Sequence, residues 1–127
     1  MRAPTRTSRI VVLAVILSLP MTTWSAADQR IRFKRGATSA HATGYLSGAG
    51  EVCYLLKAHG GQHMKVEVEA KGATVIEVST PTGEKDGEPG GMHEEDLAET
   101  GDYRICVSEH NMGEHWKGQF TLTVEIH

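Results

Sequence analysis

The chain has 127 residues and a formal net charge of −3. Residues 1–27 hold three of its 13 basic side chains and no acidic one, so residues 28–127 carry 10 basic against 16 acidic side chains, a net charge of −6. This acidity argues against nucleic acid or an anionic membrane as a partner and favours a basic one, although net charge also simply keeps exported proteins soluble.

The first 27 residues have the pattern of an export signal. Three arginines precede an apolar run of ten residues, 10–19, which is too short for the about 20 residues of a membrane-spanning helix. Pro20 ends any helix, and Ser25, Ala26 and Ala27 are small residues of the kind that a signal peptidase recognises. We expect cleavage after Ala27 and one periplasmic domain over residues 28–127. The alternative is an uncleaved N-terminal anchor.

Short segments of alternating apolar and polar residues follow, as in half-buried strands. Segment 84–99 differs because it is acidic and rich in glycine, which predicts a long surface loop with one short strand near residues 92–95. Nothing has the pattern of a long amphipathic helix. The expected fold is all-β, a small antiparallel β-sandwich of seven or eight strands. The other strands are expected over residues 31–34, 38–47, 52–58, 63–69, 74–80, 103–108 and 119–126.

The two cysteines, Cys53 and Cys106, form an even pair, which in an oxidising compartment favours a disulfide. The alternation directs Tyr54 and Ile105 inward, so both cysteines are expected on the outer face of neighbouring strands. We therefore expect a Cys53–Cys106 disulfide. In the chain-entropy model, a disulfide that closes a loop of roughly 50 residues stabilises a protein by about 4 kcal/mol.

Several short motifs follow one another along most of residues 28–127. No single motif is specific, but the ordered set resembles the periplasmic inhibitors of invertebrate-type and goose-type lysozymes, which are small β-sandwich proteins of Gram-negative bacteria. The motifs are Ile31-x-Phe33-x-x-Gly36, Ser39-Ala40 followed by Gly44-x-Leu46-x-Gly48, Tyr54-x-Leu56-x-Ala58-x-x-Gly61-Gln62, and Thr100-Gly101-Asp102-Tyr103-x-Ile105-x-Val107.

The resemblance implies a lysozyme as partner and inhibition by loops that block its cleft. One family loop has a Ser-Gly-x-Tyr sequence, and here the matching residues are Thr100, Gly101, Asp102 and Tyr103. Threonine in place of serine keeps the hydroxyl group. The alternative is structural, because the same residue types begin a sandwich strand whose tyrosine packs at the corner.

A second blocking loop precedes the last strand in the family, and we expect it to neighbour the first. Here it includes His110, Asn111, Glu114, His115 and Trp116. Family members often carry two arginines there, four residues apart, and His110 and Glu114 stand at about those positions. The tyrosine that goose-type inhibitors place after the glycine matching Gly48 is also missing, since Ala49 follows it. The lysozyme type therefore stays open, with a goose-type or invertebrate-type target favoured, and a loss of inhibition is the alternative. Trp116 either anchors a partner or folds back over the edge of the sandwich.

We expect no enzyme activity, no cofactor and no metal. The acidic run Glu94-Glu95-Asp96 is typical of a solvated face, and no serine lies in a nucleophile elbow. Two alternative functions stay open: a periplasmic binding module for an unknown ligand, and a metal-binding protein that uses histidine and methionine. The second would draw on residues without recognised metal-site spacing, namely His59, His63, Met92, His93, His110, Met112 and His115.

Overall fold

The computed structural model describes residues 28–48, 50–110 and 115–127, so the expected signal segment lies outside the described residues. Within these ranges the protein is all-β, and no helix has the length and apolar character needed to cross a membrane. The described strands are β1 (Gln29–Arg30), β2 (Ser39–Ser47), β3 (Glu51–Ala58), β4 (His63–Ala70), β5 (Thr74–Ser79), β6 (Lys85–Pro89), β7 (Met92–Asp96), β8 (Gly101–Glu109) and β9 (Lys117–Ile126).

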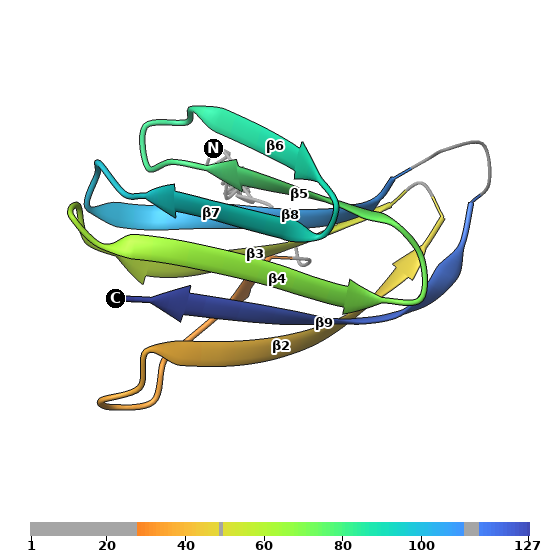
Figure 1. The fold of residues 1–127 in the computed structure, drawn as a ribbon, viewed down its shortest axis with the longest axis horizontal. Coiled ribbons are helices and arrows are strands. Elements are labelled where there is room, and N and C mark those ends of the chain that lie inside the picture. The colour runs from red at the N-terminus through yellow and green to blue at the C-terminus, as the bar shows by residue number, and fades with distance from the viewer. Residues whose placement is uncertain (1–27, 49, 111–114) are drawn as a thin grey trace, which may run out of the picture.

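The strands form the two packed layers of a β-sandwich (Figure 1). A five-stranded sheet has the order β1-β3-β8-β5-β6, and a four-stranded sheet has the order β2-β9-β4-β7. Every neighbouring pair is antiparallel except β1 with β3, which is parallel. The expected fold class is confirmed, with nine described strands instead of seven or eight.

Two segments differ from the sequence-based expectation. Residues 84–99 contain two strands, β6 and β7, joined by a turn at Gly90 and Gly91, whose φ angles are 101° and 72°. The two strands belong to different sheets, where each is an outer edge, and β6 is exposed along its whole length, which removes the apolar alternation that would have revealed it. The expected strand over residues 31–34 is wrong; pairing with β3 occurs at β1, and Ile31 donates one more hydrogen bond to Leu55 O at 2.8 Å.

Alternate side chains of both sheets fill the space between them. At its centre the rings of Tyr54 and Phe120 meet edge to face, with centroids 6.3 Å apart. A Cβ atom on Gly44 of β2 would lie 2.3 Å from the Phe120 ring and 2.7 Å from the Tyr54 hydroxyl oxygen. Only glycine fits at this point, which gives the Gly44 motif a packing role. The core also includes Leu46, Leu56, Met64, Val66, Ile76, Val78, Leu97, Ile105, Val107, Leu122 and Val124.

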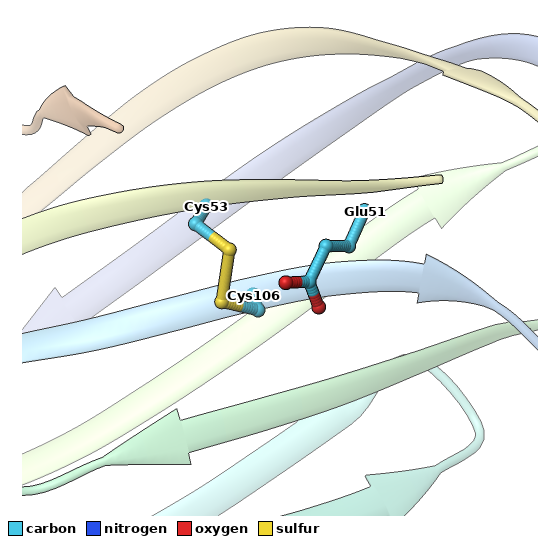
Figure 2. A group of neighbouring side chains, drawn as sticks. All are labelled: Glu51, Cys53 and Cys106. Carbon is cyan, nitrogen blue, oxygen red and sulfur yellow. A yellow bond between two sulfur atoms is a disulfide. The ribbon is translucent and has the colours of Figure 1, made fainter. Parts of the chain in front are cut away.

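The expected disulfide joins the central strands β3 and β8. Cys53 and Cys106 are register partners, and their bond spans 53 residues of sequence (Figure 2). Tyr54 and Ile105 face the core, so the disulfide faces away from it as predicted. Both cysteines are nevertheless buried, at 2% and 3% exposure.

Candidate functional site

The two predicted loops lie at opposite ends of strand β8. Thr100 directly precedes β8, whereas His110 directly follows it. The nine residues of β8 lie between Thr100 and His110, which puts the two loops about 33 Å apart at the usual rise of a strand. The expectation that they are neighbouring turns is therefore wrong. We call the two regions the Thr100 end, which includes the β3–β4 turn, and the Trp116 end, which includes the β4–β5 turn (Figure 1).

Tyr103 is part of the interior of the Thr100 end. Its side chain is 1% exposed, and its hydroxyl donates to Glu99 O at 2.6 Å and accepts from Glu99 N at 3.3 Å. Desolvation by burial raises the pKa of Tyr103 above its ordinary value. This is the alternative considered for the motif: the tyrosine fastens the corner where the chain enters β8, and its ring is not available to a partner.

The polar groups of Thr100 and Asp102 also have partners within the protein. Thr100 Oγ1 accepts a hydrogen bond from Gly60 N at 2.9 Å, which ties the loop to the β3–β4 turn. The Asp102 carboxylate accepts from both terminal nitrogens of Arg30, each at 2.9 Å. These hydrogen bonds from Arg30 lower the pKa of Asp102. Gly101, with a φ angle of 148°, lies close against Pro81. At the Thr100 end these groups all have partners within the protein, although the Asp102–Arg30 pair is exposed.

Glu109 organises the Trp116 end. Its side chain is only 4% exposed, and it accepts hydrogen bonds from Trp116 N at 2.9 Å and from His115 Nδ1. The His115 bond first, and the Trp116 bond second, lower the pKa of Glu109. The sequence analysis did not single out this carboxylate. Its signal was the alternation of β8, in which Glu109 takes the next inward position after Val107.

Trp116 folds back over the β4–β5 turn. Its Nε1 donates to Ala73 O at 3.0 Å, and His110 N donates to the same oxygen at 2.8 Å. A Cβ atom on Gly72 would lie 2.5 Å from the indole, so the ring covers this glycine closely. Trp116 is half-buried, in agreement with the alternative in which it closes the sandwich edge. Asn111 and Glu114 lie outside the described residues.

Three basic residues lie near Trp116, two of them next to it in the sequence. The His115 side chain is 58% exposed, and Lys117 is exposed at the start of β9. Lys71, in the β4–β5 turn, is also exposed, and its Cδ lies 3.7 Å from the position that a Cβ on Gly118 would take, next to the Trp116 ring. We call Lys71, His115 and Lys117 the basic patch. It lies on a protein whose residues 28–127 carry a net charge of −6.

Two groups of candidate metal ligands occur among the residues that the structure describes. The first, Glu51 with Cys53 and Cys106, contains disulfide sulfurs, which are not thiolate ligands (Figure 2). The second combines Asp86 and Glu88 of β6 with His93 of β7, across the edge where the two sheets meet. The sequence analysis missed this second group because it interpreted residues 84–99 as a loop without a defined face.

No protein-family model matches the sequence, and no curated protein matches it. Solved structures do match. Aeromonas hydrophila PliG, a periplasmic lysozyme inhibitor of g-type lysozyme, is 24% identical, with a TM-score of 0.71 over 80% of this chain and 96% of that one. PliG of Salmonella Typhimurium, described in the same words, is 20% identical, with a TM-score of 0.64 over 79% and 97%. A mutant of the Escherichia coli g-type inhibitor is 19% identical, with a TM-score of 0.63 over the same shares. At these identities the likeness establishes a shared fold.

Proposed function

We propose that this chain, which has the fold of three periplasmic inhibitors of g-type lysozyme, is itself a periplasmic lysozyme inhibitor. The observation that carries the proposal is the extent of the likeness, which takes in 96–97% of the length of those inhibitors. The export pattern of residues 1–27 and the Cys53–Cys106 disulfide fit an oxidising compartment outside the cytoplasm. We infer that the protein binds its target and is not an enzyme.

The Trp116 end is the better candidate for the blocking surface. Lysozymes cleave their substrate in a groove that contains catalytic carboxyl groups. Cations on an inhibitor complement such a groove, and this end exposes the lysines Lys71 and Lys117. In this proposal the two lysines take the role of the arginine pair that the lysozyme-inhibitor family often carries in the loop before the last strand.

The base of this end is held in place before any partner arrives. Glu109 binds both His115 and Trp116 N, and the indole is fastened to Ala73 O. A surface that is already ordered loses less conformational entropy on binding. The Thr100 end is equally ordered, but its polar groups bond to Gly60 and Arg30 within the protein. Because Thr100 and His110 lie about 33 Å apart at opposite ends of β8, we assign the blocking role to one end only.

A turbidity assay of cell-wall lysis tests the function. Purified residues 28–127 are mixed with goose-type, invertebrate-type and chicken-type lysozymes at low and high salt. We expect inhibition of at least one type, weaker at high salt, because a net charge of −6 attracts a basic enzyme. Failure to inhibit any of the three at micromolar protein and low salt would contradict the proposal and favour a binding module for another ligand.

Charge reversals at the two ends test the surface. Lys117→Glu and Lys71→Glu alter the basic patch, and Lys57→Glu makes the same change beside Asp102 at the Thr100 end. We expect the first two to weaken inhibition by about tenfold or more and Lys57→Glu to leave it within about twofold. The reverse result would assign blocking to the Thr100 end.

A further inference from the structure

His93 is a buried histidine whose ring nitrogens have no hydrogen-bond partner among the described residues. Its side chain is 1% exposed, and neither Nδ1 nor Nε2 meets a donor or acceptor at hydrogen-bond distance. A buried polar group without a partner costs free energy, so such a group indicates that something else satisfies it. The ring lies on β7, opposite Val66 of β4, and it faces the space between the two sheets.

Two carboxylates of the other sheet face the same space. Register partners in an antiparallel pair project to the same face, and Asp86 and Glu88 of β6 are opposite Val78 and Ile76 of β5, both core residues. One ligand atom each from Asp86, Glu88 and His93 lie within 4.8 Å of one another. An edge strand thus turns two carboxylates inward, toward the unpartnered histidine on the edge strand of the other sheet.

The spacing suits a shared metal ion better than a hydrogen bond. Glu88 Oε1 lies 3.7 Å from His93 Nδ1, which is too long for a hydrogen bond. Ligands bound to zinc at 2.0–2.1 Å in a tetrahedral site lie about 3.4 Å apart. On the other side of the ring, Glu95 Oε2 lies 3.5 Å from Nε2, which is also longer than a hydrogen bond but close enough to become one after a small shift. A carboxylate on the second nitrogen is the arrangement that orients many metal-binding histidines.

We propose that Asp86, Glu88 and His93 bind one divalent transition-metal ion, with Zn²⁺ as the best match for one imidazole and two carboxylates. Glu95 orients the ring, and water completes the coordination. The ion joins β6 to β7, the outer strands of the two sheets, and so fastens the open side of the sandwich. This site uses none of the residues of the basic patch and does not depend on inhibition of a lysozyme.

The chain contains its own control. His63, on the outer face of β4, also lies between two carboxylates, Glu94 and Asp96. There both ring nitrogens already have partners at 2.7 Å, and the side chain is 38% exposed. That cluster also consists of one histidine, one glutamate and one aspartate, but both nitrogens of its histidine already have hydrogen-bond partners and the side chain is exposed.

Binding of ZnCl₂ to tag-free residues 28–127, measured by calorimetry and by metal content after dialysis, tests the proposal. We expect one Zn²⁺ per chain, at least about a hundredfold weaker binding in Asp86→Asn/Glu88→Gln, and a change of less than about twofold in Glu94→Gln/Asp96→Asn. Both variants replace exposed side chains, so folding is not at risk. Absence of Zn²⁺ binding, or binding that survives the first variant or is lost in the second, overturns the site.

A second measurement separates a metal clip from adventitious surface binding. Zn²⁺ at the proposed site will slow amide exchange in β6 and β7, because these strands are the ones it joins. We expect about tenfold or greater slowing in these strands and no change in β2 at the far edge of the four-stranded sheet. Unchanged exchange in β6 and β7 at saturating Zn²⁺ overturns the proposed role.

Discussion

The two ends of strand β8 are both ordered by side-chain hydrogen bonds, but of different kinds. At the Thr100 end a neutral phenol, Tyr103, bonds to the backbone of Glu99. At the Trp116 end a buried carboxylate, Glu109, holds His115 and the backbone of Trp116. A tyrosine corner is a device of the fold itself, whereas a buried charge is costly and is kept only where its partners are positioned. The comparison shows that the conspicuous tyrosine motif at Tyr103 stabilises the fold, whereas Glu109, which the sequence analysis did not single out, orders the exposed surface.

Loss of the disulfide should affect both ends alike and produce the largest effect. Cys53→Ala/Cys106→Ala removes a link that spans 53 residues, and we expect a loss of about 4 kcal/mol in the free energy of unfolding. Denaturant unfolding of the oxidised protein and the variant measures it. A loss of less than about 1 kcal/mol would mean that β3 and β8 need no covalent link.

Gly72→Ala should disturb the Trp116 end alone. The new Cβ would lie 2.5 Å from the indole, so Trp116 must move and its bond to Ala73 O breaks; we expect about 1–3 kcal/mol of destabilisation. Trp116 is the only tryptophan in residues 28–127, so its fluorescence reports the shift directly. An unchanged spectrum and stability would contradict the packing of Trp116 on the β4–β5 turn.

Tyr103→Phe should weaken the Thr100 end by less. It removes one hydroxyl and its bond to Glu99 O, for an expected loss of about 1 kcal/mol, while the ring stays in the core. Inhibition of lysozyme should not change, because the ring is buried. A loss of inhibition with normal stability would show that the Thr100 end contacts the target after all.

Acid should loosen both ends slightly, in ways that distinguish them. The pKa values of Asp102 and Glu109 are lowered in the folded protein. Each carboxylate therefore stabilises the fold at pH above its unfolded pKa, which is about 3.9 for Asp and about 4.3 for Glu. This stabilisation is lost as the pH falls through the lower pKa of the folded state. We expect carboxyl NMR titrations to give both midpoints below those values. High salt should reduce the shift of exposed Asp102 more than that of Glu109. Equal salt effects would contradict the difference in burial.

The strands with a clear alternation were predictable from sequence, and so was the disulfide. In β4 and β9, apolar residues such as Val66 and Leu122 occupy every second position, and this alternation identifies the buried face of each strand. The edge strand β6 was not predictable, because it packs no apolar side chain and its carboxylates look like those of a solvated loop, whereas β2 and β7 match the strands expected over residues 38–47 and near residues 92–95. The role of Tyr103 depended on a hydrogen bond to Glu99, which a motif cannot show. The distance between the two candidate loops follows from the length of β8, which separates them and which the sequence already predicted over residues 103–108.

The position of β9 has a consequence for when the fold can form. This strand, the last described in the chain, lies in the middle of its sheet and pairs with β2 on one side and β4 on the other. A chain interrupted before Lys117 would leave those two strands apart, with half of the core uncovered. The four-stranded sheet therefore forms only when β9 is in place, because β9 is the strand that pairs with both β2 and β4.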